Sequence, residues 1–230
     1  MTQEEWRRIP ELCRQIEVEQ DTNIFNRLVS QLNLLLAIHD HPTGGFAANS
    51  KPTGNGHRAD DNPDSVLANG FKRIIDDAAI IMRSDFASLQ MLFPERGKGG
   101  ELLLLAFRGF NPRAAEFWKW VRADSKSTCG IALRSAQRVV APDIAACDLM
   151  ADSEDQQVYL QAGIRACQTT PVIAPGGKNV VGMISTHWHQ PHQPSEDDFH
   201  VFDIVARKAA ELIEATRRAD EALPLSSENT

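Results

Sequence analysis

The most metal-like feature of the sequence is a group of three histidines, His187, His189 and His192, in the segment His-Trp-His-Gln-Pro-His. On a β-strand, residues 187 and 189 share one face, and the turn that follows could bring the third imidazole near. Three imidazoles suit Zn²⁺. In the alternative interpretation, His187 lines a pocket while the other two lie at the strand end and in a loop. Because the sequence places no cysteine or carboxylate beside them, we expect no metal site.

His187 is the best single candidate for a ligand-binding residue. Strand alternation places Met183, Ser185 and His187 on one face, and Ile184 and Thr186 on the other. Serine and histidine together indicate a wet or ligand-lined surface, because polar groups on a sheet face must find partners. The alternative is a structural histidine that hydrogen-bonds to a neighbouring strand. The sequence leaves both interpretations open.

Four further polar residues are candidate ligand-binding residues. Gln90 on the first strand and Gln168 on the fifth are expected to face the same space, and Thr170 shares the alternation of Gln168. Their side chains could bind a polar ligand, or they could form cross-strand hydrogen bonds or be exposed. Arg108, at the end of a predicted hairpin, could bind an anionic ligand through its planar guanidinium, or it could be a surface arginine.

The four cysteines, Cys13, Cys129, Cys147 and Cys167, form no C-x-x-C pair. In a reducing compartment we expect them to be free thiols. Cys129 precedes Gly130 near a predicted helix start, where a thiolate is stabilised, so redox sensing stays open beside a buried, inert cysteine. We find no nucleophile–base–orienter set, phosphate-binding loop or pair of catalytic carboxylates. We therefore predict that the chain is not an enzyme.

Composition excludes several classes of protein. The 230 residues are 42% hydrophobic and 24% charged, as in ordinary globular proteins. The net charge of −7 makes nucleic acid an unfavourable partner. The longest apolar run, residues 102–107, is far shorter than the roughly 20 residues that span a bilayer. Since no signal peptide is visible at the N-terminus, we expect a cytoplasmic protein that binds neither nucleic acid nor membrane.

Hydropathy periodicity divides the chain into four parts. Residues 1–40 are predicted to contain an amphipathic helix, because apolar residues recur three or four positions apart. Residues 41–64 are rich in Gly and Pro and are predicted to be a flexible linker. Residues 65–216 are predicted to be the main domain, and residues 217–230 the end of the last helix and a tail.

Within the main domain, local patterns predict two β-hairpins separated by short helices. Alternating apolar residues over 87–93, the apolar run over 102–107 and Gly/Pro-rich turns at 94–100 and 175–179 indicate the hairpins. Ser65 and Ser195 are predicted helix N-caps. The predicted elements are a helix from 65, a hairpin over 86–107, helices over 113–121 and 128–136, a strand over 138–140, a helix over 153–162, a hairpin over 165–189 and a helix from 195 to 222. This order predicts an α+β fold, with an antiparallel sheet between terminal helices and short connecting helices.

Four segments of the main domain carry a family resemblance. They are Val-Val-Ala-Pro-Asp-Ile at 139–144, Gly-Ile-Arg-Ala at 163–166, Thr-Pro-Val at 170–172 and Val-Gly-Met-Ile-Ser-Thr-His at 181–187. In this order and spacing they resemble the GAF domain, and the segment Pro-His-Gln-Pro-Ser-Glu that follows fits the same family. More narrowly, they are similar to GAF modules found beside PAS domains in bacterial sensor histidine kinases.

The resemblance implies a six-stranded antiparallel sheet flanked by terminal helices on one face. Short helices and loops on the other face would cover a pocket for a small ligand or chromophore. It also implies a sensor whose terminal helices form a homodimer and relay a signal to a partner such as a histidine kinase. Because few residues follow the last helix, we expect a stand-alone GAF protein whose output acts through another chain.

Departures from GAF subclasses narrow the expected cofactors. Bilin-binding members carry a cysteine, usually followed by histidine, at the position that Glu154 occupies here, so covalent bilin is not expected. Of the signature of cyclic-nucleotide-binding members, only Phe199 and Asp203 are present. The cysteine motif of free-methionine-sulfoxide reductases is not found around the cysteines of this chain. We expect no cofactor, and the small ligand implied by the family stays unidentified.

Three hypotheses follow from these patterns. The first is a non-enzymatic sensory protein that binds a small molecule between the sheet and the short helices and so shifts the packing of its terminal helices. The second is a dimerisation or interaction scaffold without a ligand, for which a filled sheet face would be evidence. The third is a thiol-based redox enzyme, which requires two cysteines near enough to form a disulfide.

Overall fold

The computed structural model describes residues 63–222. The predicted N-terminal helix, nearly all of the linker at 41–64 and the tail after 222 lie outside the described residues. The first described helix, α3, spans Pro63–Ile81, so it begins two residues before Ser65, the predicted N-cap. Proline is favoured in the first turn of a helix, where its missing N–H would have no partner in any case.

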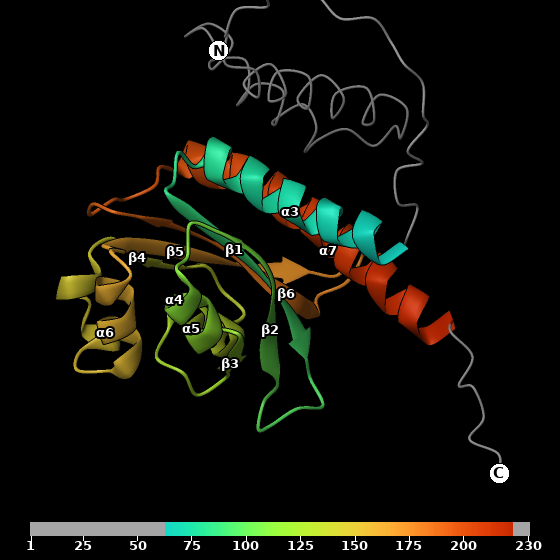
Figure 1. Ribbon diagram of the computed structural model, residues 1–230, viewed down its shortest axis with the longest axis horizontal. Coiled ribbons are helices and arrows are strands. Elements are labelled where there is room, and N and C mark those ends of the chain that lie inside the picture. The colour runs from blue at the N-terminus through green and yellow to red at the C-terminus, as the bar shows by residue number, and fades with distance from the viewer. Residues whose placement is uncertain (1–62, 223–230) are drawn as a thin grey trace, which may run out of the picture. The chain divides into compact units, whose positions relative to one another are not determined.

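Six strands form one antiparallel sheet in the order β3-β2-β1-β6-β5-β4, which confirms the predicted α+β fold. The two predicted hairpins, β1–β2 and β5–β6, meet at the central pair β1–β6 (Figure 1). The strands are β1 (Phe86–Phe93), β2 (Glu101–Arg108), β3 (Trp120–Arg122), β4 (Val139–Ala141), β5 (Ala166–Ile173) and β6 (Val180–Trp188).

The long helices α3 and α7 (Glu196–Ala222) cover one face of the sheet (Figure 1). The two helices pack closely at Gly70 of α3, where an added Cβ would lie only 2.9 Å from the side chain of Leu212 on α7. Ser195 caps α7 as predicted. Its backbone N–H donates to the Asp198 carboxylate at 2.8 Å, and the Asp198 N–H donates to the Ser195 hydroxyl at 3.2 Å, which is a reciprocal capping box.

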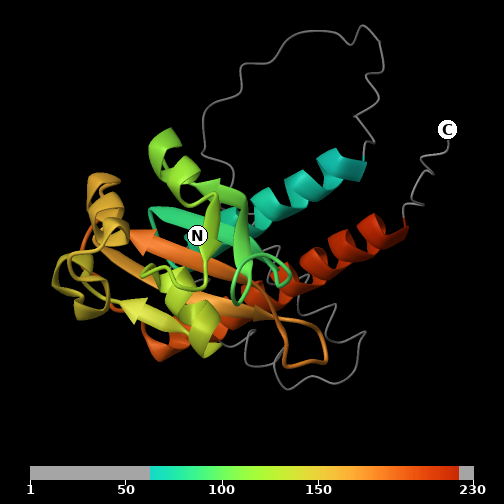
Figure 2. The same cartoon turned by 90° about the horizontal axis from the view of Figure 1, so that it is seen from below.

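Short helices cover the other face of the sheet (Figures 1 and 2). They are α4 (Pro112–Phe117), α5 (Thr128–Ser135) and α6 (Glu154–Gln161), with the 3₁₀ turns η2 (Ile144–Ala146) and η3 (Asp148–Met150) between them. Together they enclose a buried hydrophobic cluster that includes Leu102, Ile144, Met150, Ile164 and Met183, none of which is exposed. The implied arrangement of terminal helices on one face and short helices on the other is therefore confirmed.

The helix predicted over residues 113–121 is wrong at its end. α4 stops at Phe117, Trp118 caps it, and Trp120 already begins β3. β3 pairs with β2, with Trp120 opposite Leu103. A strand of three residues is too short to show its own periodicity, so the aromatic residues of this segment look like the end of a helix in the sequence.

Among the helices of residues 63–222, none is both long enough and apolar enough to span a bilayer.

Candidate functional site

Strand pairing decides which candidate residues share a face of the sheet. β1 pairs with β6 so that Phe86 is opposite His187 and Ser88 is opposite Ser185. β5 pairs with β6 so that Cys167 is opposite His187. Directly opposed residues of an antiparallel pair point to the same side. Ser185 and His187 therefore face α4, α5 and α6, together with their neighbours from β1 and β5.

Gln90 also lies on this face, because it is opposite Met183 and its side-chain amide donates to the backbone oxygen of Trp118 at 3.3 Å. The expectation that Gln168 shares this space is wrong. Gln168 is opposite Thr186, to whose hydroxyl it donates at 3.1 Å, on the face covered by α7. The physical reason is register, since a shift of one residue between two strands moves every side chain to the other face, and local patterns do not fix it.

Thr170 lies with Gln168 on the α7 face and donates to its side-chain oxygen at 3.0 Å. Arg138, beside β4, donates to the Thr170 hydroxyl at 2.8 Å and forms an ion pair with Asp203 of α7. Its guanidinium lies 4.3 Å from the centre of the Phe199 ring. Gln168 and Thr170 are thus hydrogen-bonded within a protein network that holds α7 on the sheet.

Arg108 lies apart from the other candidates. It ends β2, its side chain is exposed, and it forms an ion pair with Asp76 of α3 at 3.3 Å. An exposed ion pair of this kind contributes little free energy to folding. This placement matches the alternative interpretation of Arg108 as a surface arginine.

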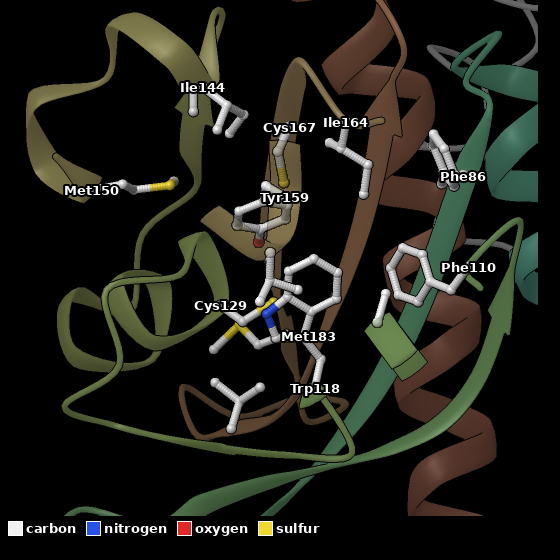
Figure 3. Packing of buried hydrophobic residues seen from close by; sticks show 14 of the residues in the cluster. Phe86, Phe110, Trp118, Cys129, Ile144, Met150, Tyr159, Ile164, Cys167 and Met183 are labelled. Atoms are coloured by element: carbon white, nitrogen blue, oxygen red, sulfur yellow. The ribbon is translucent and has the colours of Figure 1, made fainter. Parts of the chain in front are cut away.

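Four rings form what we call the aromatic cluster: Phe110, Trp118, Tyr159 and His187. Each ring contacts two others, with centroid distances of 5.3 Å for Phe110–Trp118, 4.4 Å for Trp118–Tyr159, 5.9 Å for Tyr159–His187 and 5.3 Å for Phe110–His187. Trp118 and Tyr159 point toward each other (Figure 3). The rings come from the loop before α4, the end of α4, α6 and β6, so the cluster joins the sheet to its cover.

Several buried polar atoms in and near the aromatic cluster have no hydrogen-bond partner. His187 is 2% exposed and both of its ring nitrogens are unpartnered. Burial lowers the pKa of His187 from 6.5 to about 3, so its imidazole is neutral. Trp118 Nε1 and Gln90 Oε1, both buried, are also unpartnered. Since buried polar groups are nearly always hydrogen-bonded, these unpartnered atoms need an explanation.

Ser185 belongs to a network of hydroxyl and thiol groups beside the aromatic cluster. Thr169 donates to the Thr128 hydroxyl at 2.8 Å and lies 2.8 Å from the Ser185 hydroxyl. Cys167 Sγ is 3.0 Å from the Thr128 hydroxyl, and Cys129 Sγ is 3.4 Å from that of Ser185. The polar groups of this network satisfy one another, so Ser185 already has protein partners.

Both thiols of this network are protonated at neutral pH. Burial raises the pKa of Cys129, and it raises the pKa of Cys167 to about 12. Because the thiolate is the reactive form, these environments disfavour nucleophilic or redox chemistry. Cys129 and Cys167 are free thiols, as is the half-buried Cys147.

The three histidines lie in different environments. His187 is in the aromatic cluster, the exposed His189 has its Nδ1 2.8 Å from the Gly163 carbonyl oxygen, and the His192 ring packs on Trp188 at 4.4 Å. In the described part of the chain, no group of three or more histidine, cysteine or acidic residues is arranged to hold a metal ion.

A groove with a volume of about 480 Å³ lies between α4 and α6. It is lined by residues 111–114 and by Val158, Gln161 and Ala162, and by none of the predicted site residues. No local pattern in the sequence indicates this groove, because its walls are two short helices that are distant along the chain. Trp118 and Tyr159 were missed for a similar reason, since only the fold brings them to His187.

Comparison with known proteins supports the fold. The model of the GAF domain family matches residues 71–214. A GAF domain of a phosphoenolpyruvate-protein phosphotransferase from Coxiella burnetii is 15% identical and has a TM-score of 0.55, covering 95% of this chain and 99% of its own. A domain of a two-component sensor histidine kinase from Sinorhizobium meliloti is 14% identical with a TM-score of 0.53, covering 70% and 97%.

A type II free methionine-R-sulfoxide reductase from Thermoplasma acidophilum is 14% identical with a TM-score of 0.50, covering 66% of this chain and 94% of its own. No curated protein matches the chain. These structures share the fold only, whereas the family model covers more than half of the 230 residues. The chain belongs to the GAF domain family.

Proposed function

We propose that this GAF domain is a sensory domain of bacterial signal transduction that binds a small molecule at the aromatic cluster. One observation carries the proposal: the aromatic cluster holds unpartnered polar atoms of Trp118 and His187, and Gln90, whose amide donates to the Trp118 backbone oxygen, has an unpartnered Oε1. Leaving a buried polar group unpartnered costs about 1–3 kcal/mol, so a ligand that supplies partners would bind with a corresponding gain. The proposal includes no catalysis, because the two buried thiols are protonated.

The unpartnered atoms define the polarity of the ligand. Trp118 Nε1 is a donor, Gln90 Oε1 is an acceptor, and the neutral His187 ring offers one donor and one acceptor. A neutral molecule with both donors and acceptors would satisfy them. With ring centroids only 4.4–5.9 Å apart, the ligand would have to displace a ring. Trp118 is the best candidate for this movement, because it caps a helix of only six residues.

The response would travel along β6. Because side chains alternate along this strand, His187 faces the aromatic cluster and Trp188 faces α3, where its Nε1 donates to the Met82 carbonyl oxygen at 3.3 Å. A ligand that binds one arrangement of the cluster better would shift the population toward it. In our proposal the protein is a cytoplasmic homodimer that signals through its terminal helices to a partner such as a histidine kinase, by analogy with the Sinorhizobium meliloti domain.

Native mass spectrometry of the full chain, purified gently from its own host, tests the proposal. We expect an added small-molecule mass that is lost on denaturation and that is absent from the His187→Phe variant. Thr186→Val is the matched control, because it removes a buried polar group from the same strand on the α7 face. Retention of the adduct in both variants would place the ligand elsewhere.

A ligand-free dimerisation or interaction scaffold is the second candidate function. The observation that favours it is the filled sheet face, where the hydrophobic cluster packs directly under α4, α5 and α6. A dimer without any adduct, in several growth conditions, would support the scaffold and contradict the ligand sensor.

A further inference from the structure

The groove between α4 and α6 has chemistry that the proposed function does not use. Its volume of about 480 Å³ is within the range of small-molecule sites. Its apolar floor is formed by the buried side chains of Ala114 and Val158. Both residues also belong to the hydrophobic cluster beneath, so the groove is open on the outer side of that cluster.

The rim of the groove carries hydrogen-bond donors and one positive charge. Arg113 is exposed, and within residues 63–222 it has no ion-pair or hydrogen-bond partner. The Gln161 side chain is equally free there. Asn111 uses its side-chain oxygen to accept from the Ala114 N–H at 2.9 Å, which leaves its NH₂ group available. A groove with these donors would select a ligand that carries acceptors.

The charge of the groove is opposite to that of the whole chain. No acidic residue lines it, so Arg113 gives its lining a charge of +1, whereas the chain has a net charge of −7. A local field of this sign attracts anions that the rest of the surface repels. Guanidinium groups bind carboxylates through two parallel hydrogen bonds, which gives both affinity and orientation.

We propose that this groove binds a small monocarboxylate with an apolar body, such as a short branched-chain acid. Arg113 binds the carboxylate, Gln161 and the Asn111 amide add donors, and the apolar body packs on Ala114 and Val158. The site is separate from the aromatic cluster and uses none of its unpartnered atoms, so it goes beyond the proposed function.

NMR titration of the ¹⁵N-labelled full chain tests the proposal. The probe is 4-methylpentanoate, and its neutral isostere 4-methylpentanamide is the control ligand. For a probe of this size we expect a Kd in the millimolar range, with shifts confined to the amides of residues 111–114 and 158–162. The amide should bind about tenfold or more weakly, because it lacks the charge that pairs with Arg113.

Variants test separately how the charge and the shape of the groove contribute to binding. Arg113→Gln should raise the Kd of the acid about tenfold and leave that of the amide unchanged. Arg73→Gln is the matched control, an exposed arginine on α3 across the sheet, and should change neither. Ala162→Leu should fill the groove and abolish binding of both probes, with the fold checked by circular dichroism.

Three results would overturn the proposal: equal affinity for acid and amide, equal effects of the two arginine variants, or no shifts at millimolar probe concentrations. Shifts at Gln90 and His187 instead of the groove would also overturn it, but they would favour the proposed ligand site at the aromatic cluster. Conversely, the probe could bind in the groove of a protein that shows no adduct in native mass spectrometry. That result would support the groove proposal and leave the sensor proposal without support.

Discussion

Replacing His187 with phenylalanine should remove the pH dependence that this histidine gives to the free energy of unfolding between pH 7 and pH 5. Burial lowers the pKa of the His187 imidazole from 6.5 to about 3, and neither of its ring nitrogens has a partner. A phenyl ring fits between Phe110 and Tyr159 without a polar atom to desolvate. The ligand-free variant should therefore also be about 1–2 kcal/mol more stable at pH 7.

The size of the pH effect follows from the difference between the two pKa values. Below pH 6.5 the unfolded chain protonates this imidazole, whereas the folded chain keeps it neutral down to about pH 3. The lowered pKa thus contributes stability that is complete above pH 6.5 and is lost as the pH falls toward 3. For these pKa values the free energy of unfolding falls by about 2 kcal/mol between pH 7 and pH 5, which lowers Tm by about 4–8 °C.

Urea unfolding followed by circular dichroism at pH 7 and pH 5 measures this difference. The matched control is His189→Gln, which removes an exposed imidazole at the end of the same strand and keeps His187. This control should show the same pH dependence as the wild type. In His187→Phe, the fall in the free energy of unfolding between pH 7 and pH 5 should be smaller by about 2 kcal/mol. If His187→Phe and the wild type show the same pH dependence, the histidine is not held neutral in the folded state and the reasoning is wrong.

Three further predictions test the packing around the site. Gly182→Ala should destabilise the protein by about 2–3 kcal/mol in urea unfolding, because a Cβ there would lie 2.2 Å from the Gln90 carbonyl oxygen. Arg138→Met should cost about 1–2 kcal/mol and speed hydrogen exchange in α7, because it removes the ion pair between Arg138 and Asp203; unchanged exchange would contradict this. Cys129 and Cys167 should be alkylated by iodoacetamide about 100-fold more slowly in the native protein than in urea, as measured by peptide mass spectrometry, because both thiols are buried and protonated.

Local patterns in the sequence predict most elements of this fold. The hairpins follow from alternation in β1, the apolar run of β2 and the Gly/Pro-rich turns, and the start of α7 follows from Ser195 and the carboxylate three residues later. α6 ends before Gly163, whose positive φ of 78° is typical of the glycine that follows a helix. Each of these signals acts within a few residues, so the sequence carries it directly. The three-residue strand β3 has no such signal and is not predicted, and neither are the 3₁₀ turns η2 and η3.

The candidate site is predicted less completely, because it depends on contacts between distant segments. Alternation correctly places Ser185 and His187 on one face, since this needs only one strand. It cannot place Gln168 relative to His187, which depends on the register of two strands. It also cannot find Trp118 and Tyr159, which reach His187 from α4 and α6. That these residues bind a ligand stays a prediction.

The end of β6 is the place where a change in the aromatic cluster would reach the terminal helices by the shortest path. The His187 carbonyl oxygen accepts from the Asp85 N–H at 3.0 Å, and the Asp85 carboxylate accepts from the His189 N–H at 2.8 Å. Asp85 lies just after the end of α3. Met82, the first residue after α3, accepts a hydrogen bond at its carbonyl oxygen from Trp188 Nε1. A displacement of the His187 backbone would therefore pull on three hydrogen bonds next to α3. α7 is instead held near the β4 edge of the same sheet by Arg138, so a ligand at the cluster would move α3 relative to α7 rather than both helices together.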